Sequence, residues 1–313
     1  MSVDPHNPDH GVHVTLEEML ALAAQAQGAS LAEVRRSTAA RGGLHSSRWR
    51  GRGVDFRESR VYQAGDDIRH MDWRVTARSG TPHTKLFEEE REHGLLLMLD
   101  MNPDMRFGSR VRFKNVQAAR VASLLAWMAT ARGDRVGAIG FGGGIRAEVK
   151  PMGGRRGALR VMRALRDWDN AGGESREPLS TALERARRLM RPGTRLILLS
   201  DGFSADDSAW PLLARFAGRH ELGCVILTDA LETSAPPPGR YAISIGGARH
   251  LLDFGQRRLR EEWPRQFAAV RQRLRGELTR LGARVVEIAT DADVRRAVAP
   301  LTTRAPVAGD SLA

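Results

Sequence analysis

The sequence predicts an α/β protein built on a doubly wound, mostly parallel sheet. Three stretches are apolar at successive rather than alternate positions, within residues 95–99, 195–200 and 223–228. A strand that is apolar on both faces is typical of a parallel sheet with helices on both sides. Helix-like stretches separate these strands in the order β-α-β-β-α-α-β-α-β, which favours the same architecture.

Four segments are expected along the chain. The first residues are rich in Pro, His and Asp, which predicts a disordered tail. Apolar residues then recur at helical spacing from Leu16, and a block of interleaved charged and aromatic residues follows. The expected segments are a tail (1–14), N-terminal helices and a charged extension packed on the main domain (15–90), the main α/β domain (91–300) and a second tail (301–313).

Each element has a local signal. Gly133 is expected to end a helix whose Val121, Leu124 and Met128 share one face, and the glycines at 142–144 predict a hairpin turn. The predicted elements are helices starting at Thr15 and ending at Arg36, a loop (37–53), strand 94–100, helix 115–132, strands 135–141 and 145–150, helices 155–167 and 178–190, strand 195–200, helix 208–221, strand 223–228, strands 241–245 and 249–254, helix 257–281, strand 284–288 and helix 291–300.

The composition narrows the classes of function. The formal net charge is +12, and all of the 49 basic residues except Lys85, Lys114 and Lys150 are arginines. These arginines are spread along the chain and aromatic residues make up only 5%, which disfavours nucleic-acid binding, although that function stays an alternative. Cys224 is the single cysteine. With neither a signal peptide nor a membrane-spanning stretch, we expect a cytoplasmic protein that does not bind membranes.

Acidic side chains follow each of the three apolar strands. Asp100, Asp201 and Asp229 come at the strand ends, and Asn102 and Asp104 follow Asp100 at alternate positions. The carboxyl ends of parallel strands meet at one edge, where ligands bind in open α/β sheets. Carboxylate and amide oxygens suit Mg²⁺ or Mn²⁺. We therefore predict a divalent-metal site whose ligands are Asp100, Asn102, Asp104 and Asp201. The alternative is that these acids cap turns and helices.

These residues also carry a resemblance. The apolar strand, the pattern Asp100-x-Asn102-x-Asp104 and the later Ser200-Asp201 resemble a von Willebrand factor type A domain. Such domains often hold a metal-ion-dependent adhesion site made of D-x-S-x-S, a distant Thr and a distant Asp. Here Asn102 and Asp104 stand where the two serines would be, so the implied site is degenerate. The candidates for the distant hydroxyl ligand are Ser175, Ser180 and Thr181.

The charged block contains, in a fixed order and spacing, Tyr62, Gly65, Asp66, Asp67, Arg69, Asp72, Trp73, Thr76, Ala77, Arg78, Lys85, Glu89, Glu90 and Arg91. At these positions it resembles the more specific pattern of the bacterial domain-of-unknown-function fifty-eight family. This family is related to type A domains, and the resemblance extends over roughly residues 45–300. It implies a non-enzymatic interaction or adaptor protein whose partner is a MoxR-type AAA+ ATPase.

An enzymatic alternative is a Mg²⁺-dependent phosphatase of the haloacid dehalogenase-like kind. In that case Asp100 would be the nucleophile, Ser200 would follow the later strand and Asp206–Asp207 would supply the downstream acid pair. The mechanism needs a second Asp two positions after the nucleophile to act as general acid. Asn102 occupies that position and cannot exchange the proton, so the sequence favours the adaptor.

Overall fold

The computed structural model describes residues 11–27, 54–63, 65–89, 94–245 and 248–302. The chain divides into two compact units, one made of residues 1–38 and 93–313 and the other of residues 39–92. The predicted helix ending at Arg36 and the loop over 37–53 lie outside the described residues. Nowhere in the described ranges is a helix both long enough and apolar enough to cross a bilayer.

The first unit is built on a six-stranded sheet with the order β10-β7-β6-β3-β4-β5. All neighbouring strands are parallel except β4 and β5, which form the predicted antiparallel hairpin. The prediction of an α/β protein with a mostly parallel sheet is therefore confirmed. The strands are β3 (Gly94–Asp100), β4 (Arg135–Gly142), β5 (Ile145–Met152), β6 (Thr194–Ser200), β7 (Leu222–Thr228) and β10 (Arg284–Ala289).

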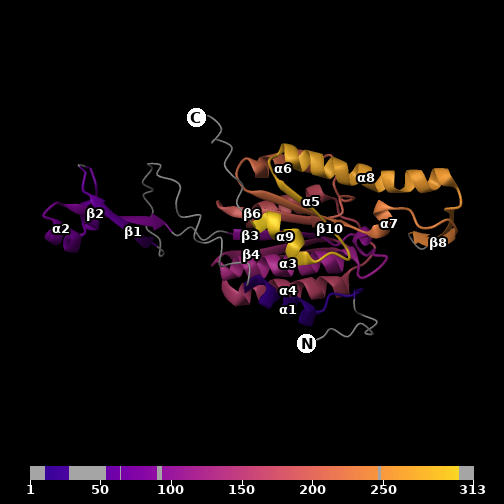
Figure 1. The fold of residues 1–313 in the computed structure, drawn as a ribbon, viewed down its shortest axis with the longest axis horizontal. Coiled ribbons are helices and arrows are strands. Elements are labelled where there is room, and N and C mark those ends of the chain that lie inside the picture. The colour runs from indigo at the N-terminus through magenta and orange to yellow at the C-terminus, as the bar shows by residue number, and fades with distance from the viewer. Residues whose placement is uncertain (1–10, 28–53, 64, 90–93, 246–247, 303–313) are drawn as a thin grey trace. The chain divides into compact units, whose positions relative to one another are not determined.

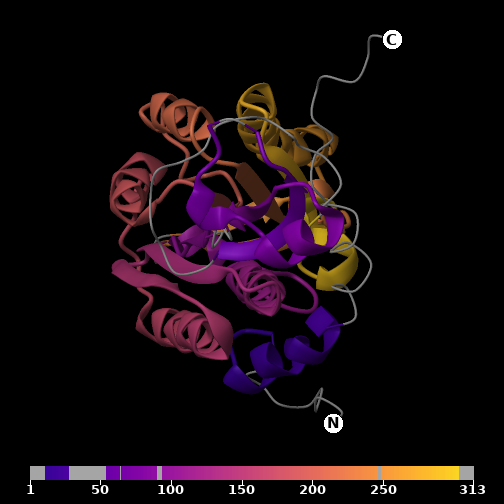
Figure 2. The same cartoon turned by 90° about the vertical axis from the view of Figure 1, so that its left-hand side faces the viewer.

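Helices cover both faces of this sheet. Figure 1 shows α1, α3 and α4 on one face and α5, α6 and α8 on the other, and Figure 2 shows the same layers from the end. A separate two-stranded sheet is formed by β8 (Arg240–Ile245) and β9 (Ala248–Asp253). The helices are α1 (Leu16–Gln27), α3 (Lys114–Ala131), α4 (Gly154–Ala171), α5 (Leu179–Leu189), α6 (Ala209–Ala217), α7 (Ala230–Thr233), α8 (Arg257–Arg280) and α9 (Val294–Thr302), with a 3-10 turn, η2 (Pro103–Met105), after β3.

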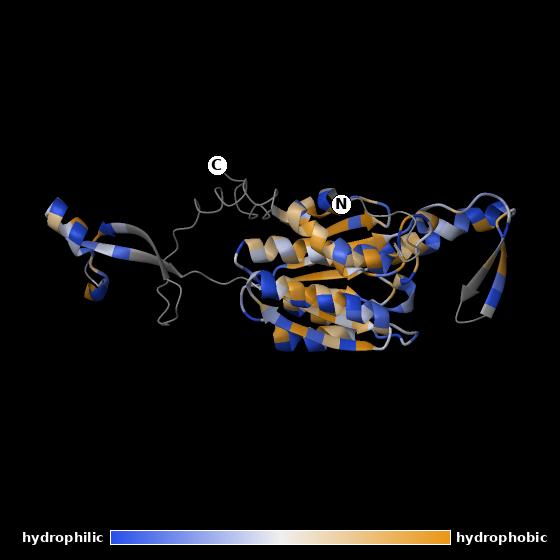
Figure 3. Cartoon of the chain, turned by 90° about the horizontal axis from the view of Figure 1, so that it is seen from below, coloured by the Kyte–Doolittle hydropathy of each residue, from blue (hydrophilic) through white to orange (hydrophobic). Residues whose placement is uncertain are grey.

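Successive residues of β3 point to opposite faces and build two cores. Leu97 and Leu99 pack in one cluster with α3 and α4, whereas Leu96 and Met98 pack in the other with α5 and α6. The consecutive apolar run is explained by this double coverage. Figure 3 shows the same apolar character along the strands of the sheet.

Helix α3 is buried along almost its whole length, because α1 packs against its outer side. Its residues are buried almost continuously from Lys114 to Ala129. The Trp127 indole N–H donates to the carbonyl of Met19 in α1 at 3.2 Å. The N-terminal helix expected from Leu16 is therefore part of the main unit, and its apolar face shields α3 from solvent.

The second unit is a small α+β module. Strands β1 (Val54–Val61) and β2 (His83–Glu89) pair antiparallel, and η1 (Ile68–His70) and α2 (Trp73–Ser79) lie between them in sequence. Asp72 caps α2 by accepting from the backbone N–H of Arg74 and Val75, and it also accepts from the Ser59 hydroxyl at 2.6 Å. Asp66 accepts from the Arg60 guanidinium at 2.7 Å. These acids of the charged block thus shape its turns.

Candidate functional site

Asp100 ends the central strand β3 and is completely buried at the carboxyl edge of the sheet. One carboxylate oxygen accepts from the backbone N–H and the side-chain amide of Asn102, at 3.0 and 2.7 Å. The other accepts from the hydroxyls of Ser200 and Ser204, at 2.7 and 2.6 Å. Burial, together with the nearby charge of Asp201, raises the pKa of Asp100 to about 6. Both Asp100 oxygens are therefore fully used inside the protein.

Asn102 connects Asp100 to the loop that precedes α5. Its side-chain oxygen accepts from the Glu177 N–H at 2.9 Å, and its amide donates to the Glu177 carbonyl at 3.1 Å. The Glu177 carboxylate in turn accepts from the Gly142 N–H and from Arg185. Gly142 has a φ of +82°, and a Cβ there would lie 2.5 Å from the Asn102 side chain. This close approach requires glycine at the turn.

Lys114, the first residue of α3, lies at the centre of the edge with an exposed fraction of only 1%. Its ammonium donates to Asp201 and to Glu232, at 2.6 Å each. Burial alone would lower the pKa of Lys114, but the two carboxylates outweigh it and raise the pKa above its ordinary value. The rings of Phe107 and Phe203 lie 5.8 and 5.9 Å from the ammonium. Lys114 is thus a buried, charged group with aromatic cover.

Asp229, the third strand-end acid, has a structural role. Its carboxylate accepts from the hydroxyl and N–H of Ser109, the N–H of Leu231 and the hydroxyl of Thr290. Burial opposes ionisation of Asp229, but these hydrogen bonds outweigh it and lower the pKa. The Asp229 N–H donates to Glu232 at 3.1 Å, which completes a capping box at α7. The capping alternative therefore describes Asp229.

Asp104, in η2, is partly exposed and pairs with a different cation. The Arg176 guanidinium forms two hydrogen bonds to its carboxylate, one of them at 2.8 Å. Among the described residues, the hydrogen bonds to Asp100 come from Asn102, Ser200 and Ser204, and not from Ser175, Ser180 or Thr181. The Ser175 carbonyl accepts from the Gly143 N–H, and the Ser180 N–H donates to Asp206 at 2.9 Å. The Thr181 N–H donates to Pro178. The hydroxyls at Asp100 belong instead to Ser200 and Ser204.

The four predicted metal ligands do not fit a divalent cation in this arrangement. Mg²⁺ needs several oxygens directed at one point, together with water. Here the Asp100 oxygens are saturated, Asp201 is paired with Lys114, and Asp104 is paired with Arg176. Within the described residues, no group of three or more His, Cys, Asp or Glu side chains is arranged to hold a metal. A Mg²⁺ or Mn²⁺ ion could bind here only by breaking these contacts. The metal site stays a prediction from the sequence alone.

The sequence patterns did not assign Lys114, Glu177, Ser204 or Glu232 to the site. Glu232 carried a usable signal, because an acid three residues after a capping Asp is the spacing of a capping box. Lys114 carried a weaker one, since lysine is rare in this arginine-rich chain. Glu177 had no local signal, because its contacts to Asn102 and Gly142 join distant parts of the sequence.

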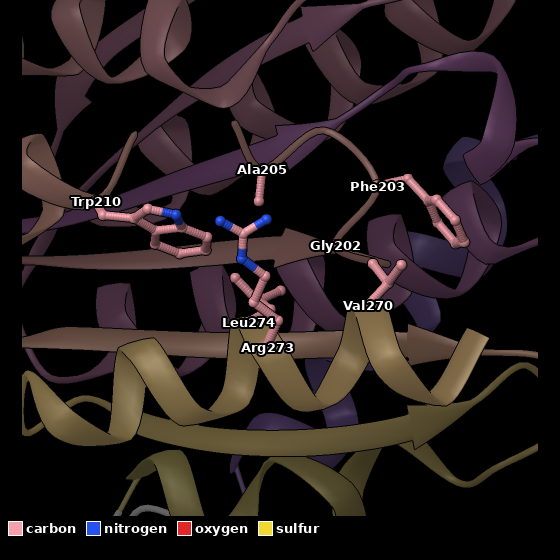
Figure 4. Close-up of a pocket in the computed structure, with 7 residues that line it drawn as sticks. All are labelled: Gly202, Phe203, Ala205, Trp210, Val270, Arg273 and Leu274. Carbon is pink, nitrogen blue, oxygen red and sulfur yellow. The ribbon is translucent and has the colours of Figure 1, made fainter. Parts of the chain in front are cut away.

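A shallow pocket opens beside the cluster, between the β6–α6 loop and α8. Figure 4 shows the Arg273 guanidinium facing the Trp210 ring, with which it makes a cation–π contact at 5.5 Å. Arg273 also pairs with Asp207. Phe203 and Val270 line the same pocket and place an apolar wall next to the carboxyl edge.

Relatives share much of this chain. The uncharacterized protein Rv1480 of Mycobacterium tuberculosis is 29% identical over 244 residues, which cover 78% of this chain and 77% of that protein. The uncharacterized protein Mb1516 of Mycobacterium bovis has the same identity over the same length.

Solved structures overlap the fold in part. The conserved hypothetical protein BatB of Bacteroides thetaiotaomicron has a TM-score of 0.42 and 15% identity, over 66% of this chain and 95% of that one. The SpRpn10 VWA domain has a TM-score of 0.36 and 8% identity, over 65% and 91%. A von Willebrand factor type A protein from Catenulispora acidiphila has a TM-score of 0.34 and 15% identity, over 47% and 35%.

The family itself is shown by the sequence. A family model described as "Protein of unknown function DUF58" matches residues 58–273, which include most of the charged block and the main sheet as far as α8. The match also contains the whole buried cluster, from Asp100 to Glu232. This chain belongs to the DUF58 family.

Proposed function

We propose that this protein is a non-enzymatic adaptor that binds a partner protein at the carboxyl edge of its main sheet. One observation carries the proposal: Phe107 and Phe203 are about two-fifths exposed, and their ring centroids lie 5.8 and 5.9 Å from the buried ammonium of Lys114. Exposed aromatic side chains on a rigid, charged base are typical anchors of protein interfaces.

The surroundings of these two rings supply the other parts of an interface. Val111 adds a further exposed apolar side chain on the loop between η2 and α3. A shallow depression next to Phe203 is lined by Asn102, Pro178 and Ser204, among others, and could receive a partner side chain. Arg176 at its rim is largely exposed. An apolar centre with a polar, charged rim fits a transient protein interface.

The chemistry of the edge also favours binding over catalysis. Asp100, the nucleophile of the phosphatase alternative, is completely buried, and its oxygens accept four hydrogen bonds. Of the downstream acid pair, Asp206 accepts from the Ser180 N–H and Asp207 pairs with Arg273. A nucleophile must reach its substrate, so this arrangement supports the adaptor.

The partner that we propose is a MoxR-type AAA+ ATPase. Its support is the family membership and the resemblance of the charged block, not a contact in this structure. Binding at this edge needs no metal, and the largely exposed Trp73 is a second candidate contact, on the second unit.

The test is a direct binding measurement with the purified MoxR-type ATPase of the same organism. We expect the Phe107→Ala/Phe203→Ala double variant to weaken binding at least tenfold, as loss of interface anchors does. The matched control is Leu251→Ala in β9, which removes a more exposed apolar side chain from another part of the main unit. Trp73→Ala tests the second unit. Absence of binding by the wild type, or equal binding by the double variant, would contradict the proposal.

A further inference from the structure

We propose that the ammonium of Lys114 serves as the built-in cation of the carboxyl edge, in place of a divalent metal ion. The ammonium lies 2.6 Å from an oxygen of Asp201, one of the predicted metal ligands, and 2.6 Å from an oxygen of Glu232. Carboxylates buried this deeply need a counter-charge, and the chain itself provides one.

The contacts of Lys114 account for its charge and for most of its hydrogen-bonding capacity. An ammonium has three N–H donors, and two of them meet carboxylates. The ring centroids of Phe107 and Phe203 lie 5.8 and 5.9 Å from the ammonium, so two carboxylates and two aromatic rings surround the positive charge. An ion entering from solvent would have to displace this whole arrangement.

The position of Lys114 points to the same role. It is the first residue of α3, where the helix dipole already carries partial positive charge. A lysine is unfavourable there for the helix alone, whereas the carboxylates of Asp201 and Glu232 are favourable. The lysine is therefore explained by the acids that it neutralises rather than by α3.

The remaining predicted ligands are satisfied in the same internal way. Asp100 is held by four neutral donors, and Asn102 is fully engaged with Asp100 and Glu177. Asp104 has its own counter-ion in Arg176. The chain thus supplies a donor or a positive charge for each oxygen ligand that a metal would use.

The experiment compares the metal response of the wild type with that of Lys114→Ala, after treatment of both with EDTA. A cation present at a hundred times its dissociation constant would raise Tm by about 4 °C in a chain of this size. We expect Mg²⁺ and Mn²⁺ to leave the wild-type Tm unchanged. We expect Mn²⁺ to raise the Tm of Lys114→Ala, because the vacated space exposes Asp201 and Glu232.

Two controls make the outcome decisive. Lys150→Ala removes an exposed lysine on β5 and should show no metal response. Mn²⁺ binding to the wild-type chain, followed by electron paramagnetic resonance, does not depend on the folding of Lys114→Ala. Stoichiometric Mn²⁺ binding by the wild type that Asp100→Ala abolishes would overturn the proposal. A folded Lys114→Ala protein that ignores Mn²⁺ would overturn it as well.

Discussion

The ion pairs of Lys114 and those on the outer side of α8 use the same chemistry in opposite surroundings. Lys114, Asp201 and Glu232 are almost completely buried. Arg257 and Arg258 pair with Glu261 and Glu262 one turn along α8, but the two arginines are more than four-fifths exposed. The distances are similar, at 2.6 to 2.8 Å. Removal of Lys114 would leave Asp201 and Glu232 buried without a counter-charge, whereas water would still solvate the glutamates on α8 if their arginines were removed.

This difference in burial determines how much each ion pair contributes to the stability of the fold. Water competes with an exposed pair and salt screens it, so such pairs contribute little to stability. A buried charge that loses its partner has no replacement and destabilises the fold strongly. We therefore expect the few buried charges at the carboxyl edge to dominate the energetics of this chain, although most of its arginines lie at the surface.

The largest effect is expected for Lys114→Met, which keeps the side-chain volume but leaves Asp201 and Glu232 without a cation. We expect the free energy of unfolding to fall by about 3–5 kcal/mol, the usual cost of breaking a buried ion pair. Urea denaturation followed by circular dichroism measures it. Lys150→Met on β5 is the control, and a loss of equal size there would remove the distinction between buried and exposed charge.

The second-largest loss of stability is expected for Asp229→Ala. The substitution removes four hydrogen bonds, including the links to Ser109 and Thr290, and it destroys the cap of α7. Because the abandoned donors are partly buried, we expect a loss of about 2–4 kcal/mol by the same denaturation measurement. Asp207→Ala, at an exposed acid, should leave the midpoint almost unchanged.

The buried Asp100 should make the stability of the protein depend on pH. Its pKa is about 6 in the folded protein, above the ordinary value of 3.8, so the folded state keeps the proton longer than the unfolded state. The resulting stabilisation is complete below about pH 4 and is lost as the pH rises through about 6. Asp100→Asn cannot titrate, so wild-type stability relative to this variant should fall by up to about 3 kcal/mol between pH 4 and 7. A pH-independent difference would contradict the raised pKa.

The smallest effect is expected for Arg258→Ala on α8. Its pair with Glu262 is exposed to solvent, so the thermal midpoint should stay within the error of a calorimetric scan. Any residual difference should disappear at high salt. A clear drop in Tm that persists in salt would show that exposed arginines contribute to the fold in a way that the pairing geometry does not explain.

The sheet could be predicted from the sequence because its signals are local. Leu95 to Leu99 form an uninterrupted apolar run, and Gly142 to Gly144 mark the hairpin turn. Each of these elements can therefore be predicted from a few neighbouring residues. The meeting of Asp100 and Asp201 at one edge also followed, because parallel strands end on the same side.

The ion pairs at that edge could not be predicted in the same way. Lys114 meets Asp201 across 87 positions and Glu232 across 118, and no spacing rule connects residues that far apart. The pairing of Asp104 with Arg176 is equally non-local. Oxygen-bearing side chains at alternate positions therefore predicted where the polar cluster lies, but not that the chain already supplies its cations.

A double-mutant cycle between Lys114 and Asp201 tests the central distinction most directly. The single variants Lys114→Met and Asp201→Asn and their combination would be compared with the same cycle for Arg257 and Glu261. We predict a coupling energy of about 2–3 kcal/mol for the buried pair and no measurable coupling for the pair on α8. Equal coupling energies in the two cycles would contradict the account.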